Sequence, residues 1–201
     1  MDDRLGRDMD KEAVVLNRIQ KSILVKRRLK DEARTIVAVA DEIVQAFRRG
    51  NKLLLFGNGG SAADAQHIAA EFAGKYLRDR DPLPAIALTT NTSSLTAIAN
   101  DYGYEHIFVR QLKALVTEGD IVIGISTSGN SPNVILAMEE AKRLGATTVA
   151  LTGHGGKLKE SADYVLSVPS QETPLIQEAH IMIGHIICQL VEEEMFGKGK
   201  E

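Results

Sequence analysis

Two stretches of the sequence decide the fold: LLLFGNGGS at residues 53–61 and IVIGISTSGNS at residues 121–131. Each is a short apolar run followed at once by Gly, Ser and Asn, which is typical of a buried strand that ends in a tight loop. Similar apolar runs lie at residues 85–88, 147–151 and 164–168, and stretches with helical spacing separate most of the runs. Strands that alternate with helices predict a parallel sheet covered on both faces. We therefore expect an α/β fold with a five-stranded, flavodoxin-like sheet.

The segments on either side of these strands have helical patterns. Residues 11–49 are charged and aliphatic at helical spacing, with Gly50 placed as a stop, and predict one or two amphipathic helices before the sheet. A last helix is expected from about Pro174 to Met195. The 201 residues suffice for one sizeable core. We predict one domain, with residues 1–50 as its helical N-terminal part, residues 51–196 as its core and residues 197–201 as a frayed tail.

Composition excludes several classes of protein. A net charge of -3 gives no electrostatic footprint for nucleic acid or an anionic membrane. Cys188 is the single cysteine, which excludes an intramolecular disulfide and a Cys-based zinc cluster. The first residues are acidic rather than basic and then apolar, and the apolar segment at residues 181–190 is short and interrupted. We expect a cytoplasmic protein with neither nucleic acid nor membrane as a partner.

The two Gly/Ser loops have the chemistry of an anion site. Glycines let the backbone approach a ligand, and the helix that follows each loop adds partial positive charge at its N-terminus. Neither loop has the pattern of a nucleoside triphosphate or dinucleotide site. If the strand order is 2-1-3-4-5, both loops border one crevice at the switch point of the sheet. The sequence therefore favours a small phosphorylated ligand between the loops.

Hydroxyl groups would donate further hydrogen bonds to such a ligand, from Ser61, Ser126, Ser128 and Ser131. The alternative is that Ser61 and Ser131 only cap helices, and capping is expected for Ser131 because Pro132 follows at the first helical position. A cap needs one serine, whereas the second loop supplies three and a threonine. This excess favours anion binding over capping alone.

Two groups of polar residues could hold a metal or move a proton. His67 and Glu71 stand at i and i+4 on the helix after the first loop, so they share a face, although such a pair is more often a surface contact. The last helix places Gln177, Glu178, His180 and His185 among isoleucines. Polar groups in an apolar stripe need partners. A core histidine and a functional site remain equally open interpretations for this helix.

Four motifs together resemble the sugar isomerase (SIS) domain, and the nearest branch is that of the phosphoheptose isomerases. They are FGNGGSAADAQH at residues 56–67, NDYG at 100–103, GISTSGNS at 124–131 and IQEAH at 176–180. The resemblance extends over about residues 16–196. It implies a single SIS domain in a homotetramer with one zinc per subunit. It also implies conversion of sedoheptulose 7-phosphate to D-glycero-D-manno-heptose 7-phosphate, the first step of heptose precursor biosynthesis.

The resemblance also assigns roles to residues. It implies the zinc ligands His67, Glu71, Gln177 and His185, with Glu71 and His185 as the catalytic acid and base. It implies substrate contacts from both loops, the NDYG motif and the metal site: Asn58, Gly59, Gly60, Ser61, Glu71, Asn100, Asp101, Ser126, Thr127, Ser128, Ser131 and Gln177.

Two features bear on this assignment. Lys75 stands where the family often has arginine. Lysine keeps the positive charge but cannot make the bidentate hydrogen bonds of a guanidinium, so a substrate role for this position is in doubt. Gln177 and His185 are separated by about 12 Å along a straight helix axis. Both reach one zinc only by stretching toward it or by coming from different subunits, and the sequence leaves both routes open.

The reaction itself needs one base near carbon and one acid near the carbonyl oxygen, because aldose-ketose exchange passes through an enediol. Glu71 and His185 meet that need. The main alternative is a non-catalytic tetrameric adaptor of the same branch that binds the bacterial replication initiator; a sugar-phosphate-binding regulator is a third possibility. The adaptor lacks the carboxylate and the second histidine. Since this chain has both, the enzyme is favoured.

Overall fold

The computed structural model describes residues 10–197. The predicted tail at 197–201 lies outside this part of the chain except for Gly197. The described residues form a parallel sheet of five strands in the order β2-β1-β3-β4-β5. The strands are β1 (Leu53–Gly57), β2 (Ala85–Ala87), β3 (Ile121–Ser126), β4 (Thr147–Thr152) and β5 (Tyr164–Ser167). The predicted strands and their parallel arrangement are therefore confirmed.

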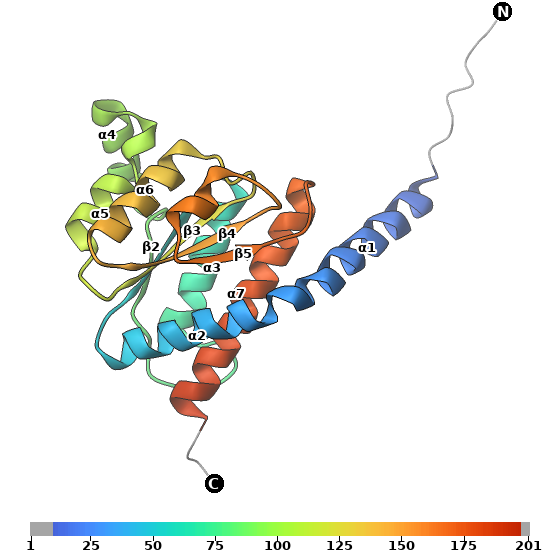
Figure 1. Ribbon diagram of the computed structural model, residues 1–201, viewed down its shortest axis with the longest axis horizontal. Coiled ribbons are helices and arrows are strands. Elements are labelled where there is room, and N and C mark those ends of the chain that lie inside the picture. Colours follow the sequence, from blue (N-terminus) through green and yellow to red (C-terminus); the bar gives the residue numbers. More distant parts are fainter. Residues whose placement is uncertain (1–9, 198–201) are drawn as a thin grey trace, which may run out of the picture.

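Alternation along the strands builds two cores, one on each face of the sheet. Leu53 and Leu55 of β1 face one core, whereas Leu54 and Phe56 face the other. Helices α2, α3 and α7 cover the first face, and α5 and α6 cover the second, with α4 further out (Figure 1). These helices are α2 (Ala33–Arg48), α3 (Gly60–Ala73), α4 (Thr92–Tyr102), α5 (Val109–Leu115), α6 (Pro132–Arg143) and α7 (Thr173–Phe196). Short 3₁₀ turns are η1 (Leu29–Glu32), η2 (Tyr104–His106) and η3 (Lys157–Ser161).

The N-terminal segment is two helices joined by one 3₁₀ turn. Asp10 caps α1 (Lys11–Arg28), because its side chain accepts a hydrogen bond from the Ala13 backbone N–H at 3.2 Å. Helix α2 packs into the core, but α1 projects away from the sheet (Figure 1) and buries only Val25. A row of apolar side chains on α1 is consequently exposed in the single chain: Val14, Val15, Leu16, Ile19, Ile23 and Leu24.

Helix α7 is the central element for the site. By length and composition alone it could cross a membrane, the one such helix in the described part of the chain, but half of its apolar window is buried within the protein. It packs against both α2 and α3. A Cβ added at Gly184 would lie 2.5 Å from Cδ1 of Ile68 on α3. Gly184 therefore lets α7 and α3 approach closely, and this contact positions the side chains on either side of it.

Candidate active site

The two Gly/Ser loops lie side by side at the carboxyl edge of the sheet. Strands β1 and β3 are neighbours, with Gly57 paired to Ile125, so their loops leave the sheet together. The Asn58 and Asn133 side chains join the loops through two reciprocal amide hydrogen bonds of 2.9 Å each. The Tyr104 hydroxyl donates to Asn58 Oδ1 at 3.0 Å and ties in the η2 turn. The predicted strand order and the adjacency of the two loops are confirmed; a shared ligand crevice stays a prediction.

Three hydroxyl groups cluster in the second loop. Ser126 Oγ lies 2.9 Å from Ser131 Oγ and 3.5 Å from Ser128 Oγ. Ser131 stands at the N-cap position of α6, as predicted, but its side chain makes no capping hydrogen bond to the described backbone. The expectation that its hydroxyl caps the helix is wrong, because the Ser131 hydroxyl forms a hydrogen bond with the Ser126 hydroxyl instead. The loop thus gathers donors at one point, as an anion site requires.

The first loop differs from expectation at its helix start. Helix α3 begins at Gly60, so the N-cap is Gly59 and the N-cap alternative for Ser61 is wrong. Gly59 has a φ of 56°, which favours glycine. Within the described residues no side chain caps α3. The N–H groups of Ser61 and Ala62 in its first turn donate to the carbonyls of Asn58 and Gly59 instead. Ser61 is buried in the first turn of α3.

A cavity of about 300 Å³ borders the second loop. Thr127 and Ser128 line it on one side, and His154, Ser170 and Thr173 line it on the other. It therefore lies between the hydroxyl loop and the first turn of α7.

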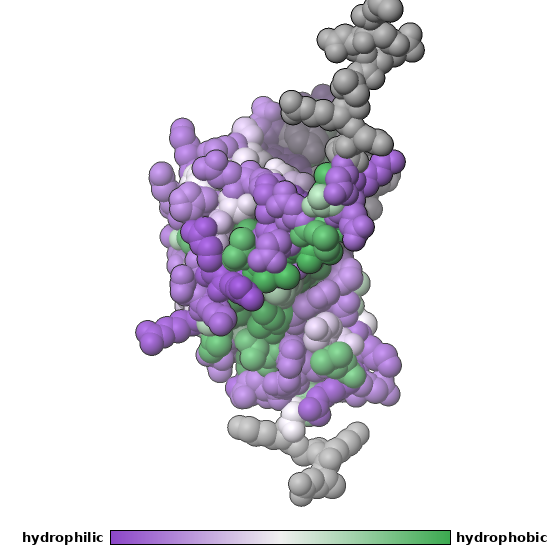
Figure 2. Space-filling view, turned by 90° about the vertical axis from the view of Figure 1, so that its right-hand side faces the viewer, coloured by the Kyte–Doolittle hydropathy of each residue, from purple (hydrophilic) through white to green (hydrophobic). Residues whose placement is uncertain are grey.

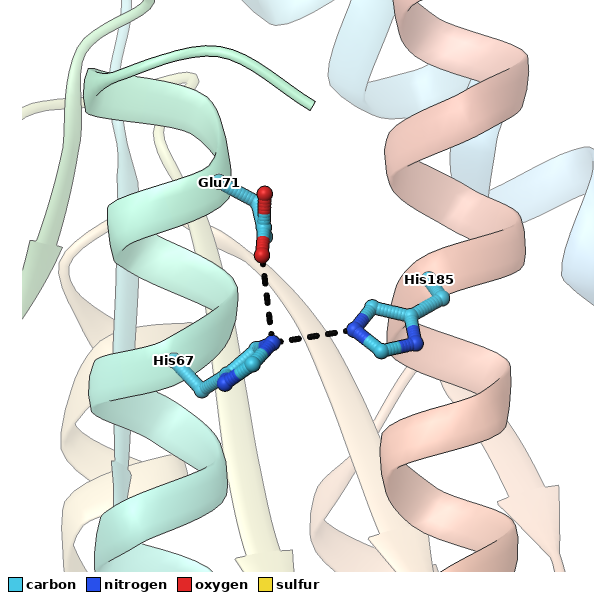
Figure 3. A group of neighbouring side chains, drawn as sticks. All are labelled: His67, Glu71 and His185. Carbon is cyan, nitrogen blue, oxygen red and sulfur yellow. Dashed lines mark hydrogen bonds and ion pairs between the residues drawn. The ribbon is translucent and has the colours of Figure 1, made fainter. Parts of the chain in front are cut away.

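The metal-type cluster is assembled from α3 and α7 (Figure 3). His67 Nε2 lies 3.1 Å from Glu71 Oε1 and 2.9 Å from His185 Nε2. The ligand-type atoms of all three residues lie within 4.8 Å of one another. The His67 side chain is 49% exposed and that of Glu71 is 23% exposed. The cluster is therefore preformed within one chain and partly exposed to solvent.

The geometry fits a zinc ion. Zinc prefers imidazole nitrogen and carboxylate oxygen at about 2.0–2.2 Å, so its ligand atoms lie roughly 3.3 Å apart in a tetrahedron. The separations around His67 are close to that value. Three protein ligands with one open position are typical of catalytic zinc. His67, Glu71 and His185 are thus a suitable donor set.

Gln177 lies elsewhere in the single chain. Its amide packs against Gly60, where an added Cβ would collide with it. Gly60 precedes His67 by seven residues on α3, about 10 Å along the helix axis. The described chain therefore does not bring Gln177 to the cluster, and its role as a ligand stays a prediction. Its neighbour Glu178 instead accepts a hydrogen bond from Ser22 of α1 at 2.6 Å.

His180 is not part of the cluster, and it is not a core histidine with satisfied hydrogen bonds either. Its side chain is fully buried, and neither ring nitrogen has a hydrogen-bond partner among the described residues. Burial lowers the pKa of His180 to about 4, although the nearby Thr152 carbonyl works in the opposite direction. The ring is therefore neutral in the folded protein at neutral pH.

Asn100 and Asp101 lie at the exposed end of α4. The Asn100 amide donates to Asp101 Oδ1 at 2.8 Å. No hydrogen bond in the described chain joins either side chain to the two loops, although Tyr104 of the following turn reaches Asn58. Their substrate roles stay predictions, as does any role for the exposed Lys75.

Sequence reasoning missed three residues beside the site. Asn133 follows Pro132 directly at the start of a helix and faces its buried side. A polar residue in this position is a signal that the sequence offered. Tyr76 stacks on the His185 ring, with centroids 5.7 Å apart and an interplanar angle of 30°. Asp64 lies one turn before His67, and burial raises its pKa to about 6 while His67 lowers it. Nothing in the sequence indicates the last two, because both depend on how α3 and α7 pack.

Comparison with known proteins shows the family and the fold of this chain. The model of the SIS domain family matches residues 19–153. Phosphoheptose isomerase from Aneurinibacillus thermoaerophilus is 58% identical over 186 residues, covering 90% of this chain and 94% of the relative. The Aquifex aeolicus phosphoheptose isomerase is 61% identical over 162 residues, covering 80% of this chain and 85% of the relative. The solved structure of phosphoheptose isomerase from Neisseria gonorrhoeae has a TM-score of 0.86 and 42% identity, covering 90% of this chain and 98% of that chain.

The sheet order, the paired Ser/Gly loops and the family match define a sugar isomerase domain. Within that class, the matches at 58% and 61% identity cover 94% and 85% of the two phosphoheptose isomerases. The chain therefore belongs to the phosphoheptose isomerase branch of the SIS domain family. The resemblance inferred from the four sequence motifs is confirmed.

Proposed function

We propose that this protein isomerises sedoheptulose 7-phosphate to D-glycero-D-manno-heptose 7-phosphate. The observation that carries the proposal is the cluster of Glu71 and His185 around His67, in a chain of the phosphoheptose isomerase family. A carboxylate and an imidazole on facing helices supply the base and acid that proton transfer between adjacent carbons requires. They face each other from α3 and α7, with ligand-type atoms within 4.8 Å, so both can reach the same bound sugar.

The hydroxyl loop is proposed to hold the phosphate. The clustered Ser126, Ser128 and Ser131 side chains and the N-terminus of α6 support this role. Thr127, Ser61 and the backbone of Gly59 and Gly60 would complete the cradle. Binding energy from the phosphate, remote from the reacting carbons, then keeps the open-chain sugar in register.

His67, Glu71 and His185 are proposed to hold one zinc per subunit. Gln177 would join them only if its amide leaves Gly60 or if a second subunit supplies it. When bound, zinc would polarise the substrate carbonyl. The residues of the chain do the remaining work: Glu71 and His185 hold or move the proton, and Asn58, Asn100 and Asp101 orient hydroxyls. Which of Glu71 and His185 acts first depends on their coupled protonation.

A homotetramer is proposed because one chain leaves a large apolar face uncovered. Figure 2 shows hydrophobic surface gathered on the side where α1 and α7 lie in Figure 1. A mainly apolar groove of about 350 Å³ lies there between the start of α2 and the middle of α7. Together with the exposed row on α1, it is the kind of surface that marks association. Helices α1 and α7 of neighbouring chains would cover one another.

Two further proposals concern organisation and location. We take residues 1–50 and 51–196 as one domain, since α2 and α7 share the core on one face of the sheet. A cytoplasmic enzyme with no nucleic acid or membrane partner fits the net charge of -3 and the half-buried α7.

The adaptor and regulator alternatives are less well supported. Both would bind without catalysis and need no Glu71 or His185, whereas these side chains are assembled with His67. The test is to incubate the purified protein with sedoheptulose 7-phosphate and follow the aldose product. Conversion supports the isomerase; calorimetric binding without conversion would favour a regulator.

A further inference from the structure

The segment between α3 and β2 has no helix or strand, yet it is firmly held. Residues 74–84 run from the C-terminal end of α3 back to the sheet. This segment begins three residues after Glu71 and carries Tyr76, whose ring stacks on His185. The contacts that hold this segment in place therefore also hold the surroundings of the candidate metal site.

Glu192 of α7 anchors the start of this segment. Its carboxylate accepts hydrogen bonds from three successive backbone N–H groups, those of Tyr76 at 3.2 Å, Leu77 at 3.0 Å and Arg78 at 2.9 Å. Burial works to raise the pKa of Glu192, but these N–H groups and the Arg80 guanidinium hold it below its ordinary value. Glu192 is therefore an ionised carboxylate inside the protein.

Arg80 completes the anchor from the segment itself. Its Nε lies 3.1 Å from Glu192 Oε2, and both side chains are only 3% exposed. Its remaining N–H groups donate to the carbonyls of Glu71 at 2.8 Å, Phe72 at 2.8 Å and Gly74 at 3.2 Å. The carbonyls of Glu71 and Phe72 belong to the last turn of α3, where helix carbonyls lack partners within the helix, and Gly74 is its C-cap residue. One guanidinium thus joins the end of α3 to α7.

The Arg80–Glu192 pair lies beside the candidate metal site. Glu192 follows His185 by seven residues, about two helical turns, so both project from the same side of α7. The Glu71 carbonyl that Arg80 binds belongs to a proposed metal ligand. The backbone N–H of Tyr76 donates to Glu192, and the Tyr76 ring lies against the His185 imidazole.

We propose that Arg80 and Glu192 are positioning residues that press the Tyr76 ring against His185 and so fix the His185 imidazole for metal binding. The inference rests on the proposed metal site. Ligands held in one orientation by their neighbours bind metal more tightly, because less ordering remains for the binding step. The Tyr76 ring, not its hydroxyl, does the orienting.

The test measures zinc affinity of the purified, metal-free full chain by competition with a chromophoric chelator. Tyr76→Leu removes the ring but leaves the Arg80–Glu192 pair intact, and should weaken zinc binding about tenfold or more. Tyr76→Phe keeps the ring and should bind zinc within about twofold of the wild type by the same reasoning. Glu192→Gln should weaken zinc binding like Tyr76→Leu, with a lower melting temperature.

Asp120→Asn is the matched control for a general loss of stability. Asp120 is also a buried carboxylate that accepts backbone N–H groups and a cation, but its hydrogen-bond partners in the described chain, Asn51, Lys52 and Thr117, belong to neither α3, α7 nor residues 74–84. It should lower the melting temperature without changing zinc affinity. Folded Tyr76→Leu protein with wild-type affinity would overturn the positioning role alone. A wild type that binds no zinc would overturn the metal site itself, and this inference with it.

Discussion

The Nε2 atoms of His67 and His185 lie 2.9 Å apart, although 118 residues separate them in the chain. Gly184 makes this contact possible, because its missing side chain lets α7 settle against Ile68 on α3. The two histidines occupy the positions next to that contact. The spacing of two helices therefore sets the dimensions of the proposed metal site.

Gly184→Ala is expected to push the helices apart. The new methyl group would meet Ile68 Cδ1 at 2.5 Å, and such overpacking costs about 1–3 kcal/mol. Both the melting temperature and the zinc affinity should fall. Adding Ile68→Ala removes the clashing atoms and should restore part of the zinc affinity. If the double variant binds zinc no better than Gly184→Ala, helix spacing does not control the site.

Ser128→Ala tests the hydroxyl loop. Loss of one donor to the phosphate weakens substrate and transition state alike, so KM should rise more than kcat falls. Steady-state kinetics with sedoheptulose 7-phosphate measure this split. Ser93→Ala, on the exposed first turn of α4, is the matched control and should change neither constant. Normal calorimetric binding of the substrate by Ser128→Ala would refute the loop assignment.

His180 makes stability depend on pH. Its pKa is about 4 when folded and about 6.5 when unfolded. The unfolded chain therefore takes up a proton that the folded chain resists, and stability is lost as pH falls from about 6.5 to about 4. At about 1.4 kcal/mol per pKa unit, the pKa shift contributes roughly 3 kcal/mol to the free energy of unfolding. Most of this contribution is lost by pH 4.5. In metal-free protein, the unfolding free energy of His180→Leu relative to wild type should rise by that amount between pH 7.5 and 4.5. Parallel pH profiles would contradict the buried neutral ring.

A charge on the α1 face tests the proposed assembly. Ile19→Glu places a carboxylate on an apolar side chain that is 52% exposed in the single chain, so the subunit should still fold. Buried between subunits, the unpaired charge should dissociate the tetramer, which sedimentation velocity would report. Gln20→Glu, an exposed neighbour, is the control and should leave the assembly intact. A monomeric wild type at micromolar concentration would refute the tetramer.

The sheet could be predicted from the sequence because parallel strands are buried on both faces. Such strands appear as continuous apolar runs, and the run at residues 121–125 matches β3 to within one residue. The strand order alone predicted that the loops after β1 and β3 lie side by side. The Asn58–Asn133 pair then follows from the loops being neighbours.

Side-chain choices in the site could not be predicted in the same way. Ser131 has two possible partners, the α6 backbone and Ser126, and only the folded loop determines which it takes. The distance between His67 and His185 depends on a close helix contact at Gly184, which no periodicity encodes. Tyr76 reaches His185 from an irregular segment whose path depends on the buried Arg80–Glu192 pair.

The most direct test compares wild type with Glu71→Gln in the same isomerisation assay. Glu71→Gln keeps the shape and one oxygen ligand but removes the charge and basicity, so the protein should fold normally, bind zinc more weakly and lose turnover. His185→Ala should behave similarly, and the double variant should lose little more than either single, since residues that act as one unit are not additive. With zinc-loaded protein and sedoheptulose 7-phosphate, the wild type should form the aldose product and Glu71→Gln should form none. No product from the wild type, or equal turnover by both proteins, would contradict the account.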